Sequence, residues 1–148
     1  MDKTVNDIQE EIIEEFSFLG DDRESAIFYM MDLGNKLEPL DDRYKSEEYI
    51  VKGCQSKVWL MTDFIDGKVI FKADSNTEIT KGLISMLIRI WNERTPEEII
   101  NTDLYFIDKI GMKSLVGSQR SNGFAAMIKQ MKLYALGYLS KEDVRIEK

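Results

Sequence analysis

Residues 57–75, "KVWLMTDFIDGKVIFKADS", decide the fold because they have the pattern of two β-strands joined by a tight turn. Apolar and polar side chains alternate on both sides of Asp66-Gly67, and this dipeptide is a strong signal for a two-residue hairpin turn. The upstream segment "EYIVK" (48–52) shows a similar alternation, so we expect it to add a strand. The sequence therefore predicts a small three-stranded antiparallel sheet.

Two helical patterns precede this sheet. Apolar residues recur every three or four positions in a first stretch that ends near Gly20, and in a second that runs from about Arg23 to Lys36. Pro39 ends the second run, and polar residues then connect it to the strands. We therefore expect two N-terminal helices.

Further helices follow the sheet. Ser75 and Glu78 have the spacing of a capping box, and "TPEE" at 95–98 repeats it with proline in the first turn. The segment "GSQRSNG" (117–123) precedes a last amphipathic helix, for which Gly137 is the expected end. Two helices, three strands and then helices predict an α+β fold.

Length and charge restrict the class of protein. The 148 residues fit one domain spanning the whole chain, and the net charge of −7 argues against nucleic acid as a partner. The N-terminus lacks the basic start and apolar run of a signal peptide, and no apolar stretch is long enough to cross a membrane. We therefore expect a cytoplasmic protein whose partners are proteins or small molecules.

The chain has one cysteine, Cys54, and no histidine. An intrachain disulfide, a catalytic dyad or triad of the usual histidine type, and a zinc site built from several cysteines or histidines are therefore excluded. The common glycine-rich nucleotide-binding loops are absent as well. The sequence predicts no metal site and no cofactor.

Cys54 lies in a turn, where its neighbours are Gly53, Gln55 and Ser56. A lone cysteine often serves as a small buried hydrophobe, but such a residue belongs inside an apolar run. Glycine before the cysteine favours an unusual backbone angle that presents the side chain. Among the uses of a presented thiol, carrying sulfur requires the least help, because a thiolate can attack the outer sulfur of a donor persulfide directly.

Arg120, at the expected start of the last helix, is a candidate to stabilise the Cys54 thiolate. A nearby cation or a helix N-terminus lowers the pKa of a thiol and so increases the fraction that is reactive at neutral pH. A solvated arginine at a helix end remains an equally good interpretation of this residue.

Four segments resemble the SufE-type cysteine desulfuration proteins, which include the CsdE group. They occur in the family's order and extend the resemblance from about Phe16 to Tyr138: "FYMMDLGNKLEPL" (28–40), "GCQSKVWL" (53–60), "GKVIFKADSNTEITKGLISML" (67–87) and "RSNGFAAMIKQM" (120–131). The resemblance implies an α+β fold related to that of the IscU-type scaffold proteins. Those scaffolds use several cluster ligands, whereas this chain has a single thiol.

The resemblance also implies a function. Similar proteins accept sulfur from the persulfide of a pyridoxal-phosphate-dependent cysteine desulfurase of the SufS or CsdA kind. They carry it on the motif cysteine, here Cys54, raise the turnover of the desulfurase and pass the sulfur to an iron–sulfur scaffold such as a SufBCD-like complex. No stand-alone catalysis is expected, and the resemblance leaves a homodimer open.

A carrier benefits from sheltering its persulfide, because persulfides are readily oxidised and reduced. We expect the neighbouring apolar residues Val58, Trp59 and Leu60 to provide this shelter. A buried thiol is poorly accessible, so the loop has to swing outward for transfer, with Gly53 as its hinge.

Two other interpretations stay open at this point. The chain could be an interaction module that activates a desulfurase without carrying sulfur itself. A cysteine hydrolase is the other, and it needs a base that the sequence does not show. The acidic pairs Asp21-Asp22 and Asp41-Asp42 could be imagined as catalytic groups. They lie in predicted turns, however, where aspartate usually caps a helix.

Overall fold

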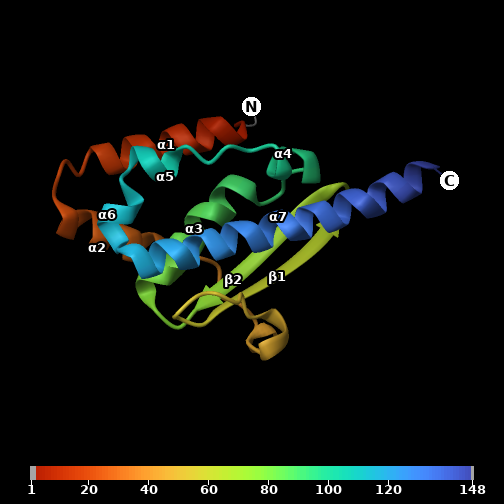
Figure 1. Cartoon of the computed structure of the whole chain (residues 1–148), viewed down its shortest axis with the longest axis horizontal. Coiled ribbons are helices and arrows are strands. Elements are labelled where there is room, and N and C mark those ends of the chain that lie inside the picture. The colour runs from red at the N-terminus through yellow and green to blue at the C-terminus, as the bar shows by residue number, and fades with distance from the viewer. Residues whose placement is uncertain (1–2, 148) are drawn as a thin grey trace.

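The computed structural model describes residues 3–147, with side chains through Lys141. Two helices come first, a short hairpin follows, and the remaining chain is helical (Figure 1). In chain order the elements are α1 (Val5–Ser17), α2 (Arg23–Asn35), the 3₁₀ turns η1 (Asp42–Tyr44) and η2 (Glu47–Tyr49), β1 (Val58–Ile65), β2 (Lys68–Ser75), α3 (Glu78–Trp91), α4 (Pro96–Ile100), α5 (Phe106–Lys109), α6 (Met112–Val116) and α7 (Ser118–Glu147). The α+β class and the two N-terminal helices are confirmed.

The hairpin has the turn and the alternation that the sequence predicts. Asp66 and Gly67 both adopt positive φ values, 53° and 79°, which suit a tight turn between right-twisted strands. Val58 pairs with Ser75 at one end of the ladder and Ile65 pairs with Lys68 at the other. One face of the hairpin is buried in the core through Val58, Leu60, Val69, Phe71 and Ala73.

The predicted third strand is wrong, because the described sheet has two strands. Glu47 and Glu48 form a 3₁₀ turn with Tyr49, so only the end of the segment is extended. Ile50 makes an isolated antiparallel bridge to Trp59 before the chain turns again. The extended stretch between this 3₁₀ turn and the turn that contains Gly53 is only two residues long, which is too short for a strand.

A close helix crossing holds α2 against α3. A Cβ atom added at Gly82 would lie 2.1 Å from the carbonyl oxygen of Met30, and one added at Gly34 would lie 2.7 Å from the backbone nitrogen of Gly82. Only glycine at both positions permits this approach of the two backbones. The crossing fixes α3, whose other side packs on β2.

The last helix, α7, runs along the length of the molecule in Figure 1 and contacts α3, α4 and α6. Its core face is formed by Phe124, Met127, Met131 and Ala135, which are all buried. The prediction that the helix ends at Gly137 is wrong, because α7 continues to Glu147. Nothing lies within 4 Å of a Cβ added at Gly137, so no packing constraint interrupts the helix there. The capping box at Thr95 and Glu98 is confirmed.

Candidate functional site

Cys54 lies on a short loop that is fixed at both ends. At its start, the backbone nitrogen of Val51 donates a hydrogen bond to the carbonyl oxygen of Val58 over 2.8 Å. At its end, the backbone of Lys57 is held by the turn between β2 and α3. Ser75 Oγ donates to the Lys57 carbonyl over 2.8 Å, and the Lys57 nitrogen donates to Asn76 Oδ1 over 3.0 Å.

This arrangement corrects the predicted capping box at Ser75. Ser75 is the last residue of β2 and is buried, and its hydroxyl is used to hold the cysteine loop. The N-cap of α3 is Thr77, whose side chain makes no capping hydrogen bond and instead donates to Ser56 Oγ over 3.2 Å. The loop and the start of α3 are therefore tied together by hydroxyl groups.

The tip of the loop rests on the first turns of α7. Gly53 has a φ of 97°, which favours glycine, and a Cβ atom there would lie 3.1 Å from the Cβ of Ala126. On the next residue, the Cys54 thiol donates a hydrogen bond to the carbonyl oxygen of Gly123 over 3.4 Å. The loop therefore lies closed against the helix, with small residues at both points of contact.

The Cys54 thiol is half-buried and packs against the hydrophobic core. It lines a small cavity of about 80 Å³ between the loop, α3 and α7. Burial raises the pKa of the Cys54 thiol above its ordinary value, because the thiolate loses solvation. The closed loop therefore holds the cysteine in its protonated and less reactive form.

The cavity brings together some of the predicted site residues and adds others. Gln55, Ser56 and Arg120 line it with Cys54, whereas Gly53 does not line it and instead approaches Ala126 of α7. The sequence analysis missed the remaining lining residues, which come from α3 and α7: Thr80, Leu83, Gln119, Gly123 and Met127. The apolar wall consists of Leu83 and Met127, both about 1% exposed.

The expected shelter residues lie elsewhere. Val58 and Leu60 are buried in the core beneath the hairpin, and they do not line the cavity. Trp59 is on the opposite face of β1, where it pairs with Asp74 and bridges Ile50. We expected β1 to shelter the thiol because it lies close to Cys54 in the sequence. The thiol is instead enclosed by α3 and α7, which are distant in the sequence.

Arg120 lies in the first turn of α7, at the exposed rim of the cavity. Its Nη1 donates to the carbonyl oxygen of Val116 over 3.5 Å, which directs the side chain along the preceding turn. In the closed loop, burial raises the pKa of the Cys54 thiol. The predicted effect of Arg120 on the thiolate remains a prediction, and it applies to an open loop.

The cavity offers a thiol without a general base. Of the described residues that line it, none is an aspartate or a glutamate, and the chain contains no histidine. Within residues 3–147, no three acidic, cysteine or histidine side chains come together in a way that could hold a metal ion. In the same part of the chain, no helix combines the length and the apolar composition that crossing a membrane requires.

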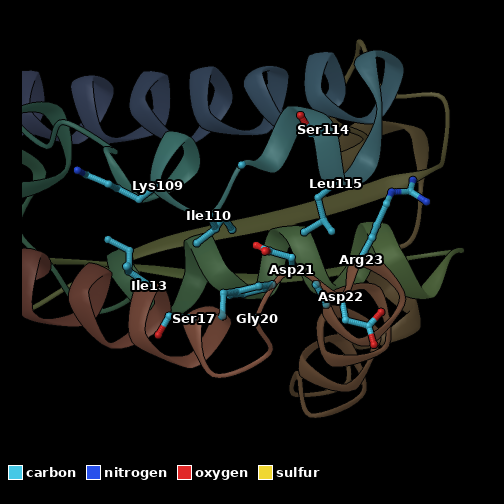
Figure 2. A pocket seen from close by; sticks show the side chains of 13 residues that line it. Ile13, Ser17, Gly20, Asp21, Asp22, Arg23, Lys109, Ile110, Ser114 and Leu115 are labelled. Atoms are coloured by element: carbon cyan, nitrogen blue, oxygen red, sulfur yellow. The ribbon is translucent and has the colours of Figure 1, made fainter.

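A larger groove of about 530 Å³ lies between the α1–α2 turn and the segment α5–α6. Figure 2 shows Asp21, Asp22 and Arg23 on the turn and Lys109, Ile110 and Leu115 on the facing segment. Asp22 caps α2 by accepting hydrogen bonds from the backbone nitrogens of residues 24 and 25. This groove contains no thiol, and Asp22 has the capping role that its turn position predicts.

Residues 10–135 match the family described as "SufE: Fe-S metabolism associated domain". The chain belongs to the SufE family. The resemblance seen in its motifs is therefore confirmed over most of its length, and with it an association with iron–sulfur metabolism. The Cys54 loop lies inside the matched segment.

Two SufE-like relatives, both uncharacterised, agree with this assignment. One, from Synechocystis, is 36% identical over 105 residues, which make up 71% of this chain and 66% of that protein. The other, from Rhizobium meliloti, is 34% identical over an alignment of 135 positions that covers 88% of this chain and 96% of that protein. The chain thus spans about two thirds of the first relative and nearly all of the second.

The fold also matches a solved structure. The solution structure of a hypothetical protein from Thermus thermophilus superposes with a TM-score of 0.72, at 18% identity, over 90% of this chain and 96% of that one. At this low identity the likeness supports the α+β fold and no more.

Proposed function

We propose that this SufE-family protein is a sulfur carrier that holds a persulfide on Cys54. The observation that carries the proposal is the position of the only thiol in the chain. It lies on a glycine-containing loop and is turned into a small cavity that contains no general base. Such a site suits a reaction that transfers a sulfur atom and needs no proton shuttle.

The transfer step is a thiol–persulfide exchange. The Cys54 thiolate attacks the outer sulfur of a donor persulfide, a new S–S bond forms on Cys54, and the donor's S–S bond breaks. The donor cysteine leaves as a thiolate, so that the sulfur changes its carrier without net oxidation or reduction. Delivery repeats the same exchange, with the Cys54 persulfide as donor.

Storage and transfer require two positions of the loop. The closed position protects the sulfur between the apolar side chains of α3 and α7, while the raised pKa of Cys54 keeps the free thiol unreactive. Transfer requires the thiol to reach a donor outside the cavity. Gly53, exposed and with a positive φ, is the hinge on which the tip swings, and the anchored residues Val51 and Lys57 limit the movement.

The donor is a pyridoxal-phosphate-dependent cysteine desulfurase, and the acceptor is an iron–sulfur assembly scaffold, both in the cytoplasm. The rim of the site supports docking to an acidic surface. Lys52 and Lys57 are exposed beside Cys54, and Arg120 is exposed at the cavity, in a chain whose net charge is −7. A local cationic rim on an acidic protein favours one orientation of approach.

The test compares wild type with Cys54→Ser in a desulfurase turnover assay that follows alanine and sulfide release from L-cysteine. Wild type is expected to raise the turnover, and Cys54→Ser is expected to bind the desulfurase without raising it. Full stimulation by Cys54→Ser would contradict the carrier role. It would favour the alternative, an interaction module that activates a desulfurase without carrying sulfur.

A further inference from the structure

Gly123 is a buried glycine inside the long helix α7, one turn beyond the exposed start of that helix. Glycine in a helix interior is less favourable than alanine, because it loses more backbone freedom on folding. Its φ is not positive, so the backbone conformation does not require glycine. A reason for this residue has to come from its surroundings.

The nearest of those surroundings belong to one residue. A Cβ atom added at Gly123 would have Cys54 Sγ at 3.4 Å, Cys54 Cα at 3.6 Å and Cys54 Cβ at 3.7 Å as its three nearest neighbours. These separations are ordinary van der Waals contacts, so the closed loop with a free thiol has room for a methyl group. In the same helix, Gly137 has nothing within 4 Å of an added Cβ.

The missing side chain at Gly123 therefore leaves more space than the thiol needs. A second sulfur on Cys54 would replace the thiol hydrogen, which is donated to the Gly123 carbonyl oxygen, and at about 2.05 Å from Sγ it would lie beside the place that a methyl group at Gly123 would take. Carbon atoms pack at about 3.5–4.0 Å from their neighbours, so the methyl group and the outer sulfur would compete for this space. The cavity of about 80 Å³ well exceeds the space that one water-sized atom requires.

We propose that Gly123 is a positioning residue that leaves room for the outer sulfur of the Cys54 persulfide in the closed loop. This inference rests on the proposed carrier function and adds to it the residue that makes the cavity specific for the loaded state. The outer sulfur lies against Gly123, with the apolar side chains of Leu83 and Met127 completing its enclosure. The free thiol does not distinguish glycine from alanine at this position, whereas the persulfide does.

The test uses Gly123→Ala, with Gly137→Ala as the matched control. Both variants gain helix propensity, but only the first adds an atom beside Cys54. Each protein is loaded with inorganic polysulfide, whose terminal sulfur is attacked by the Cys54 thiolate and which leaves one sulfur shorter. Since the chain has one cysteine, intact mass reports one site. The loss of the added sulfur to glutathione is then followed over time.

The loaded Gly123→Ala protein is expected to lose its sulfur at least about fivefold faster than wild type, because its loop cannot close over the persulfide. Gly137→Ala is expected to match wild type. The alkylation rate of the unloaded thiol is expected to stay within about twofold in both variants, since the thiol fits beside a methyl group. Equal persulfide lifetimes in wild type and Gly123→Ala would overturn the inference. So would an equal acceleration of alkylation and sulfur loss in Gly123→Ala, because that would show a general opening of the loop.

The two proposals fail separately. Loading with polysulfide needs no desulfurase, so a long-lived wild-type persulfide that Gly123→Ala shortens supports the inference even if a desulfurase delivers no sulfur. Delivery by a desulfurase to wild type, together with equal lifetimes in the two proteins, supports the carrier function and overturns the role of Gly123.

Discussion

Cys54 and Gly123 are 69 residues apart in the chain, and the thiol of the first donates a hydrogen bond to the carbonyl oxygen of the second over 3.4 Å. A thiol can make this bond, whereas a thiolate cannot, because a carbonyl oxygen only accepts. The closed loop therefore favours the protonated cysteine through the hydrogen bond as well as through burial. Deprotonation weakens the contact that holds the loop on α7.

The stability of the protein should reflect this preference at alkaline pH. The pKa of Cys54 is raised in the folded state from an ordinary value of 9.0, so the folded state binds more protons above that pH than the unfolded state. The contribution of Cys54 to stability is therefore complete below pH 9.0 and is lost as the pH rises through the folded pKa.

Urea unfolding of wild type and Cys54→Ser, at neutral and at strongly alkaline pH, measures the effect. Wild type is expected to lose more stability than the variant over this range, and tyrosine titration cancels in the comparison. Parallel losses in the two proteins would show that the folded state does not shift the thiol's pKa.

Gly53→Ala should strain the closed loop and release it. The substitution places a side chain at a φ of 97° and brings it to 3.1 Å from Ala126 Cβ. A strained backbone conformation of this kind costs about 1–3 kcal/mol. We expect several-fold faster alkylation of Cys54 at a fixed pH, together with slower sulfur transfer because the hinge is stiffened.

Gly111→Ala is the matched control, because Gly111 also has a positive φ but has nothing within 4 Å of an added Cβ. It should lose stability without changing the alkylation of Cys54. If Gly53→Ala transfers sulfur at the wild-type rate, Gly53 is not the hinge of the loop.

Arg120→Gln should slow the alkylation of Cys54 at neutral pH. The effect arises in the open loop, where the thiol leaves its buried position and a nearby cation stabilises the thiolate. The pH profile of alkylation is expected to move to higher pH in the variant. Lys129→Gln, which removes an exposed charge from the same helix, serves as control. Identical profiles for wild type and Arg120→Gln would leave this arginine without a role at the thiol.

Gly82→Ala should destabilise the fold strongly, because the added Cβ would lie 2.1 Å from the backbone oxygen of Met30. Overpacking of this kind costs about 3 kcal/mol or more when a backbone has to move. Since α3 forms one wall of the cysteine cavity, separation of α2 from α3 should also expose Cys54. Chemical denaturation and thiol alkylation report the two effects, and a stability equal to that of Gly137→Ala would contradict the close crossing.

Local patterns were sufficient to predict most of the elements. The apolar periodicity placed α1 and α2, Asp66-Gly67 placed the hairpin turn, and Thr95 placed the start of α4. The error at Ser75 has a tertiary cause, because its hydroxyl holds the cysteine loop and does not cap α3. The other two errors are local: a 3₁₀ turn replaces most of the expected third strand, and α7 continues through Gly137, where nothing packs against the helix.

The enclosure of the site was not predictable from neighbouring residues. The sequence singled out Cys54 and its loop, but it assigned the shelter to Val58, Trp59 and Leu60, which follow a few residues later in the chain. The structure encloses the thiol with Leu83 of α3 and Met127 of α7. These side chains meet Cys54 only because the loop, α3 and α7 pack together, although they are far apart in the sequence. The apolar periodicity of a segment predicts which of its faces is buried, but not which segments pack against that face.

Intact-protein mass spectrometry tests the central claim most directly. The protein is mixed with a cysteine desulfurase and L-cysteine without reductant, and Cys54→Ser is treated in parallel. The account predicts a mass gain of one or more sulfur atoms in wild type, which is lost on reduction and absent from the variant. A desulfurase whose turnover rises while the wild-type mass stays unchanged would contradict the claim that Cys54 carries sulfur.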